Sequence, residues 1–584
     1  MRPSLVQFST HISDGNRCGS YGFGPLAGER QASSVVPSDG GRDDLVRRER
    51  EAGGTPSRSS NFREYQTRGE VAATAATSNS IKAGLPGDGK TMSTAPTAGE
   101  AQPLREGARA FLSAAIAALT ESHVVPTSRW RSYIRVGKDY AGSEVMCLPE
   151  FDQFEAALKV SYPHRLDRPL SDRSIENSNH YIFGLLEACV AEFAAFDEPY
   201  AANSSIVEEA IDDLVEALDA EDYELVCCRV VSHLTTTDRK PAVVGGVTIH
   251  PQLEPAGYSH PLTTIAKSIP GAGRAFDDGP PFAYDPPISI LTVRATTSDD
   301  PLMVGGRLSG QLDRFLLLSR LIHGATGRSH WQIVGSSARV GRSSPTGDSF
   351  VRGSNGPQFI RREGRLATSQ SQAFESLGHL LENAKIARGG KMFTSFDMAL
   401  HRFTRSYTND NLFDCVVDLA TSMEAALLGG SGAREDIGLR LKSRAAALLA
   451  TGEDPASKIF RDMTALYDVR SSLVHGGSLA EKDLIRYLRR LVPDYDKLSF
   501  GVALAKAVDR FRDLVRRAIL ARLALAADPD ALWKLEEDPG VDAALSDDST
   551  RLIWRDRWRD SLARMGLEDA SLPAGPATDW TAGL

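Results

Sequence analysis

Six segments with helical periodicity follow one another between residues 366 and 527, and no strand-like run separates them. In each segment apolar residues recur at intervals of three and four, the spacing of one face of an α-helix. Glycine pairs and an Asp-Pro pair lie where helices should end or begin. The sequence therefore predicts an all-helical domain over residues 366–527, with helices at Ser369–Ala387, Ser395–Tyr407, Asn411–Leu428, Arg434–Ala450, Asp454–Leu473 and Ser499–Ala527.

Residues 104–365 carry a different pattern, in which strand-like and helix-like segments are mixed without regular alternation. Such mixing favours an α+β domain over a βαβ arrangement. The predicted strands are Leu225–His233, Ala242–Ile249, Ile288–Ala295 and Trp331–Val334. The predicted helices are Tyr181–Ala195, Ser205–Asp219 and Ser309–His323.

The two ends of the chain look unlike these domains. Residues 1–103 are rich in Gly, Ser, Thr, Arg and Ala and are expected to be disordered, because they cannot bury enough apolar surface to offset the entropy of ordering. A start of translation near Met92 is the alternative reading of this segment. Residues 528–584 are expected to form an acidic tail with one short helix at Ser549–Met565. The chain of 584 residues is thus predicted to be multidomain, with an α+β domain followed by an all-α bundle.

Composition excludes several classes of function. The net charge of -9 gives no global attraction to nucleic acid, so any contact with RNA must be local. No stretch approaches the roughly 20 apolar residues of a spanning helix, so no membrane contact is expected. The six cysteines and the dispersed histidines show no ligand or disulfide spacing, which predicts no metal, no cofactor and a cytoplasmic protein.

One charged residue lies on an apolar helix face. Arg470 falls in phase with Ile459, Met463, Leu466 and Leu473, so its guanidinium should face the domain body or a partner. Burial of a permanent charge is costly without compensation. His475 follows five positions later, about 140° away on a continued helix, but Gly476-Gly477 predicts that the helix ends there and lets the imidazole fold back.

Three stretches together carry a family resemblance. They are LYDVRSSLVHGGS (Leu466–Ser478), FDMALHRFTRSYTNDNLFDCVVDLATSMEAALLGG (Phe396–Gly430) and GLRLKSRAAALLA (Gly438–Ala450). In order, spacing and residue type this region of about 160 residues resembles the Apea-like branch of the HEPN superfamily. Many HEPN ribonucleases have Asn, His or Asp after the arginine, whereas this chain has Ser471.

The resemblance implies a metal-independent endoribonuclease with Arg470 and His475 as catalytic residues and Ser471, Asp468 and Glu424 in support. A histidine can take the proton of the ribose 2′-OH, and an arginine can stabilise charge on the phosphorane. The resemblance also implies RNA as the partner and a homodimer through the helical domain. A role in antiviral defence or stress growth arrest, with an unknown protein trigger or inhibitor, is implied by the family alone.

Other interpretations of the same residues remain open. Arg470 could pair with Glu424 or Asp414 inside the bundle, and His475 could cap a helix C-terminus. The domain would then be a catalytically inactive HEPN module for dimerisation and for binding RNA or a protein. Two basic groups could contact phosphates or simply be solvated; they are Arg486, Arg489 and Arg490, and Lys506, Arg510, Arg512, Arg516 and Arg517.

Overall fold

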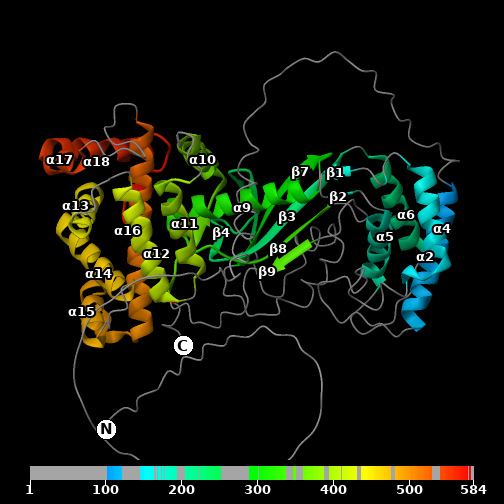
Figure 1. Cartoon of the computed structure of the whole chain (residues 1–584), viewed down its shortest axis with the longest axis horizontal. Helices are drawn as coiled ribbons and strands as arrows, with labels where there is room; N and C mark the ends of the chain where they lie inside the picture. The colour runs from blue at the N-terminus through cyan, green and yellow to red at the C-terminus, as the bar shows by residue number, and fades with distance from the viewer. Residues whose placement is uncertain are drawn as a thin grey trace, which may run out of the picture. The chain divides into compact units, whose positions relative to one another are not determined.

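The computed structural model describes residues 102–121, 145–163, 166, 169–171, 174–175, 178–193, 204–220, 222–251, 288–299, 301–336, 346–349, 360–386, 393–409, 411–429, 436–474, 480–528, 540–575 and 578–579. All of the described residues belong to one compact unit within residues 73–584, which is mostly helical and contains a small antiparallel sheet (Figure 1). The predicted disordered extension of residues 1–103 lies almost wholly outside the described residues.

Four helices near the N-terminal end of the described chain form a separate hydrophobic core. They are α2 (Gln102–Glu121), α4 (Pro149–Ser161), α5 (Ser178–Phe193) and α6 (Ser204–Asp219), with the small hairpin β1 (Pro169–Ser171) and β2 (Ser174–Ile175) between α4 and α5. Phe111 stacks on Phe154 with ring centroids 5.6 Å apart, and both side chains are fully buried. The sequence predicted α5 and α6 but did not predict α4.

A six-stranded antiparallel sheet in the order β5-β6-β7-β3-β8-β9 follows. Its strands are β3 (Tyr223–Ser232), β5 (Ala242–Val244), β6 (Val247–Pro251), β7 (Ile288–Thr297), β8 (Arg328–Ser336) and β9 (Thr346–Ser349). The central strand β3 pairs along its whole length with β7 and from Leu225 onward with β8, and Cys227 opposes Val293 and Val334. The predicted strands are confirmed, with β8 longer than expected and the second run divided into β5 and β6 by a turn at Gly245-Gly246.

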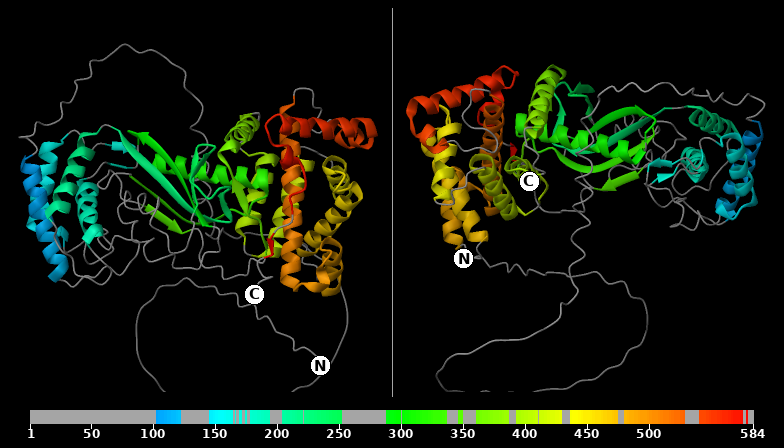
Figure 2. Two further views of the ribbon diagram at one scale, coloured as in Figure 1. Left: turned by 180° about the vertical axis from the view of Figure 1, so that it is seen from behind. Right: turned by 45° about the horizontal axis from the view of Figure 1, so that its top comes forward.

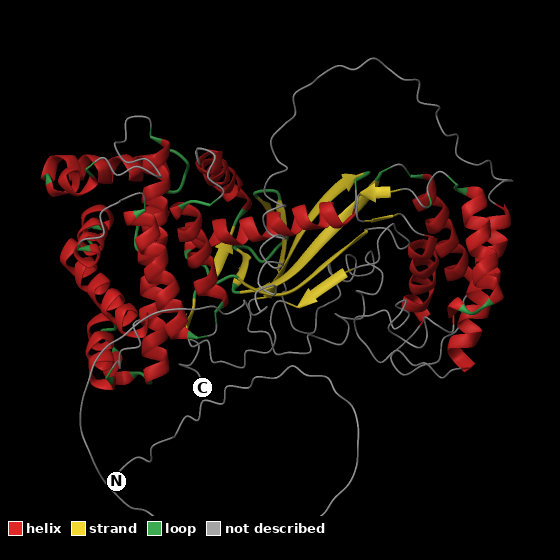
Figure 3. Ribbon diagram, viewed as in Figure 1, coloured by secondary structure: helices red, strands yellow, loops and turns green. Residues whose placement is uncertain are grey.

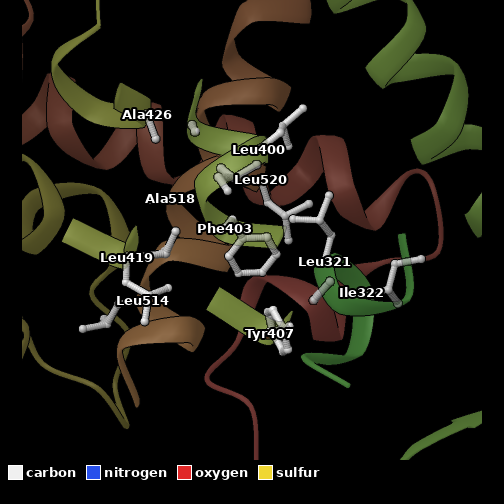
Figure 4. Close-up of a cluster of buried hydrophobic side chains, with 14 of the residues drawn as sticks. Leu321, Ile322, Leu400, Phe403, Tyr407, Leu419, Ala426, Leu514, Ala518 and Leu520 are labelled. Atoms are coloured by element: carbon white, nitrogen blue, oxygen red, sulfur yellow. The ribbon is translucent and has the colours of Figure 1, made fainter. Parts of the chain in front are cut away.

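The long helix α9 (Pro301–His323) connects this sheet to the helical bundle. It packs on β3 and β7, as Figure 3 shows, and the sequence predicted this helix only from Ser309 onward. At its C-terminal end, Leu321 and Ile322 pack among Leu400, Phe403 and Leu514 from helices of the bundle (Figure 4). The short strands β4 (Leu234–Thr236) and β11 (Gly364–Leu366) pair in parallel and make a second connection. Sheet and bundle therefore share one hydrophobic core.

The bundle contains the six helices that the periodicity predicted. They are α10 (Ser371–Ile386), α11 (Ser395–Thr408), α12 (Leu412–Leu428), α13 (Ile437–Leu449), α14 (Ala456–Val474) and α16 (Phe500–Ala527). A seventh helix, α15 (Glu481–Leu491), was not predicted, although it buries Leu484 and Leu488. Thr394 and Asp397 form a capping box that fixes the start of α11. Within the described part of the chain, no helix has the length and apolar content to cross a membrane.

The described residues 540–575 join the core, which corrects the prediction of an acidic tail but confirms the short helix predicted at Ser549–Met565. Helices α17 (Val541–Ser546) and α18 (Asp548–Ala563) pack on α13 and α16, as two further views show (Figure 2). Trp558 is fully buried, and its indole N–H donates to Leu448 O at 3.3 Å. Strand β12 (Thr578–Asp579) pairs with β10 (Ile360–Arg361). The acidic composition suggested a solvated tail, but Trp554 and Trp558 supply enough apolar surface for α18 to pack on the core.

Candidate active site at the end of helix α14

Helix α14 carries Arg470 one turn before its end. Its apolar stripe is buried as predicted, since Ile459, Met463 and Leu466 have no exposed surface. Arg470 continues this stripe, and its side chain keeps 21% of its surface exposed. The guanidinium is therefore half-buried, between the deep burial of a core ion pair and the exposure of a surface arginine.

Glu424 on α12 is the ionic partner of Arg470. The distance from Arg470 Nη2 to Glu424 Oε2 is 3.6 Å, which is beyond a good charge-assisted hydrogen bond. Arg470 Nε and Glu424 Oε1 are both buried and have no hydrogen-bond partner. Burial raises the pKa of the Glu424 carboxyl, and the charge of Arg470 only partly offsets this effect. The ion pair is thus loose, and each partner has hydrogen-bonding capacity that the fold does not use.

The aromatic ring of Tyr467 lies beside the same arginine. Arg470 Cζ is 6.0 Å from the centre of that ring, and Lys442 Nζ on α13 is 5.7 Å from it. A Cβ atom at Gly438 would come within 3.1 Å of Tyr467 Cε1, so this glycine lets α13 approach the ring closely. Neither Tyr467 nor Lys442 was singled out from the sequence, because their contact joins two helices and leaves no local pattern.

The other supporting residues are placed differently. The Asp468 carboxylate accepts a hydrogen bond from the Tyr487 hydroxyl of α15 at 3.1 Å, and no contact joins it to Arg470 in the described chain. Ser471 is partly buried, and within the described residues no hydrogen bond involves its side chain. Asp414 is exposed and lies in no ion pair with Arg470 among the described residues. Of the predicted set, the structure brings together Arg470 and Glu424.

His475 lies outside the described residues, as do Gly476 and Gly477. The described part of α14 ends at Val474, the residue directly before the histidine. The predicted return of the imidazole toward Arg470 therefore stays a prediction.

The basic residues of α16 do not form a phosphate-binding or solvated face, which corrects both interpretations of their pattern. Arg516 and Arg517 are buried with 1% and 0% of their side chains exposed, and Arg510 keeps only 15%. Arg510 pairs with Asp462 of α14, Arg517 pairs with Asp454 in the segment before α14, and Arg516 pairs with Asp513 of α16 itself. Lys506 pairs with Asp494 at 2.7 Å. Arg512 lies over the Tyr407 ring, 4.6 Å from its centre.

Asp454 is the centre of this buried network. It accepts hydrogen bonds from Arg510 at 2.7 Å and from Arg517 at 2.5 Å, so its carboxylate is committed to α16 and not to capping α14. Asp462 pairs with Arg510 at 2.9 Å, and Asp513 pairs with Arg517 at 3.2 Å. The network fastens the N-terminal half of α14 to α16 and leaves Arg470 at the far end of the helix.

The basic residues of α15 are exposed, so they could be solvated or contact phosphates, the two interpretations offered for them from the sequence. Arg486 and Arg489 are each paired with a carboxylate, Asp483 at 3.2 Å and Asp496 at 3.1 Å. Arg490 and Lys482 have no ion-pair partner among the described residues. In the same part of the chain, no three His, Cys, Asp or Glu side chains come together in a set that could hold a metal ion.

No family model, curated protein or solved structure matches the chain. Any assignment of function therefore depends on the residue pattern and on the geometry around Arg470.

Proposed function

We propose that the helical domain is a metal-independent endoribonuclease in which Arg470 and His475 do the chemistry. The observation that carries this proposal is the incomplete pairing of Arg470, whose guanidinium is half-buried, 3.6 Å from one carboxylate and without a partner at Nε. The resemblance of the surrounding residues to the Apea-like HEPN branch supports the same assignment and supplies RNA as the substrate.

Arg470 is suited to bind a phosphodiester. A guanidinium presents several N–H donors in a plane and binds phosphate oxygens in pairs. Since the contact with Glu424 is long and includes no hydrogen bond, a phosphate can take these donors without breaking a strong bond. Partial burial strengthens the attraction, because less water screens the charges. Arg470 would then stabilise the negative charge that develops on the phosphorane.

Glu424 acts in this proposal as a positioning residue. Its carboxylate compensates the arginine's charge when no RNA is bound and keeps the guanidinium on the α12 side of α14. The raised pKa of Glu424 reflects its burial. His475 takes the 2′-OH proton, a role that an imidazole can perform near neutral pH.

The same ion pair also favours a second candidate function. An arginine that pairs within its own bundle needs no substrate, so the domain could be an inactive HEPN module that dimerises and binds RNA or a protein. Homodimerisation, a protein trigger or inhibitor, a cytoplasmic location and a role in antiviral defence or growth arrest are proposed with the family resemblance as their support.

The experiment is to incubate the purified protein with total RNA in EDTA. We expect the wild-type chain to cleave RNA, and Arg470→Ala and His475→Ala each to abolish cleavage, because neither proton transfer nor charge stabilisation needs a metal here. Arg461→Ala is the matched control, since Arg461 is an exposed arginine on the same helix. Cleavage that EDTA abolishes and a divalent ion restores would contradict the mechanism.

Thermal unfolding separates the two candidate functions. Because Arg470 and Glu424 keep 21% and 22% of their side chains exposed, Arg470→Ala should cost only about 1–2 kcal/mol, less than the roughly 3–5 kcal/mol of a fully buried pair. Circular dichroism would measure the loss beside the cleavage assay. An Arg470→Ala protein that is strongly destabilised but still cleaves RNA would favour the inactive-module interpretation of this residue.

A further inference from the structure

Two cations from different helices approach one aromatic ring at the candidate site. Lys442 Nζ of α13 and Arg470 Cζ of α14 both lie within 6.0 Å of the centre of the Tyr467 ring. Helices α13 and α14 are neighbours along their length (Figure 1). A cation is attracted to the face of an aromatic ring, but two cations near the same ring repel each other.

The carboxylates that form ion pairs with Lys442 and Arg470 in the described chain do not balance the two positive charges. Glu424 is the carboxylate that pairs with Arg470, and burial raises the pKa of that carboxyl. Lys442 is partly buried and has no ion-pair partner among the described residues. Within the described chain Glu424 is the one carboxylate in an ion pair with either cation, so these three groups together carry an excess of positive charge in a chain whose net charge is -9. Such an excess attracts an anion.

The packing of α13 on α14 brings both cations to the Tyr467 ring. Gly438 and Lys442 are four residues apart on α13 and so lie on the same face, while Tyr467 and Arg470 are three residues apart on one face of α14. Gly438 packs against the Tyr467 ring, and a Cβ atom there would lie 3.1 Å from Tyr467 Cε1, so a larger residue would have to displace the ring slightly. Lys442 is thus held toward the ring and Arg470 by the packing of the helices, and the placement is not the chance position of a surface lysine.

We propose that Lys442 is a second phosphate-binding residue, which holds a phosphate of the RNA strand next to the phosphate at Arg470. The choice of RNA as the anion rests on the proposed ribonuclease function. A lysine binds phosphate as a compact point charge, whereas the arginine binds with paired donors at the phosphate that reacts. The Tyr467 ring lies within 6.0 Å of both cations and helps to hold them at the site.

A binding assay with an uncleavable ligand tests this role. A single-stranded RNA oligonucleotide with 2′-O-methyl groups cannot be cleaved, because its 2′ oxygen has no proton to lose. Fluorescence anisotropy over a range of salt concentrations gives both the affinity and its salt dependence. Lys442→Met keeps the apolar stem and removes the charge, and Lys442→Arg keeps the charge. Lys482→Ala on α15 is the matched control, since Lys482 is exposed and also has no ion-pair partner within the described chain.

We expect Lys442→Met to weaken binding about tenfold, as for loss of one charge-assisted hydrogen bond. The slope of log affinity against log salt should fall by about 0.7, the value for one phosphate contact on a single strand. Lys442→Arg should restore most of the affinity, and Lys482→Ala should change it less than twofold.

The inference is overturned if Lys442→Met binds like the wild type, if Lys482→Ala weakens binding as much, or if the wild type does not bind the oligonucleotide. Binding that depends on Lys442 in a protein that fails to cleave ordinary RNA would instead defeat the proposed ribonuclease function and leave the phosphate site in place. Cleavage of RNA that is indifferent to Lys442→Met would defeat the phosphate site alone.

Discussion

Replacing Asp454 with alanine removes the carboxylate at the centre of the buried network between α14 and α16. Asp454 is 2% exposed in its side chain and binds Arg510 at 2.7 Å and Arg517 at 2.5 Å. After the replacement, Arg510 retains Asp462 and Arg517 retains Asp513. Arg516 also pairs with Asp513. The three arginines 510, 516 and 517 would then have only Asp462 and Asp513 as partners in this network, so one positive charge is left without compensation.

The size of the effect follows from this count. Removal of one partner from a buried ion pair costs about 3–5 kcal/mol, because the other charge stays out of water. Since Arg510 and Arg517 each keep one carboxylate, we expect the lower end, about 3 kcal/mol. With a urea slope of about 3 kcal/mol per molar, the unfolding midpoint should fall by about 1 M.

Urea unfolding followed by circular dichroism measures this loss, with Asp299→Ala as the control. Asp299 pairs with Arg307 at 2.8 Å, but both side chains are more than half exposed, so its removal should cost less than about 1 kcal/mol. Asp454→Asn keeps the shape of the side chain and removes its charge. If Asp454→Ala unfolded at the same urea concentration as Asp299→Ala, the network would not stabilise the bundle and the reasoning would be wrong.

The same effect should depend on pH. Burial alone would raise the pKa of the Asp454 carboxyl, but the hydrogen bonds and charges of Arg510 and Arg517 outweigh burial and hold this pKa below its ordinary value. A carboxyl whose pKa is lowered by folding contributes stability above its unfolded pKa, about 3.9. The difference between wild type and Asp454→Ala should therefore be full at neutral pH and shrink as the pH falls below about 4.

Three further outcomes are expected. Burial, and next the charge of Arg516, lowers the pKa of His323 to about 4. The free energy of unfolding should therefore be highest above pH about 6.5 and fall by up to about 3 kcal/mol as the pH is lowered toward 4. In urea unfolding, His323→Gln should lose less stability over that pH range, and an equal loss would show that another group titrates. Trp558→Ala should cost about 3–5 kcal/mol because the indole is fully buried, whereas a cost near zero would restore the interpretation of a tail. Light scattering at micromolar concentration should give at least a dimer, and a strictly monomeric mass would count against a composite site.

The sequence by itself determined where most helices and strands of the two domains lie. The recurrence of apolar residues fixed the interior of α11, α12, α14 and α16 to within a few residues, because a helix in a folded domain must bury one face. The β-branched run at β3 likewise identified the central strand of the sheet. The sequence analysis missed α4 and α15, although both place apolar residues on one face, with Phe151, Phe154 and Leu158 buried in α4 and Leu484 and Leu488 buried in α15.

The sequence also identified Arg470 as an unusual charge on an apolar stripe, and it included Glu424 as one of two possible partners. It could not choose between Glu424 and Asp414, because both lie on the same distant helix and only the rotation of α12 in the bundle turns Glu424 toward α14. The sequence also did not reveal the contact of Lys442 with Tyr467, because it depends on how α13 packs against α14.

Only the tertiary structure decided whether the basic side chains of α16 are solvated or buried in ion pairs. A row of arginines on a helix looks the same in sequence whether water or carboxylates surround it. Arg510 and Arg517 are buried because Asp454 and Asp462, some 50 residues earlier, come to lie against them. Periodicity shows which face of a helix is buried, but the partner that makes burial of a charge possible is set by packing between segments far apart in the chain.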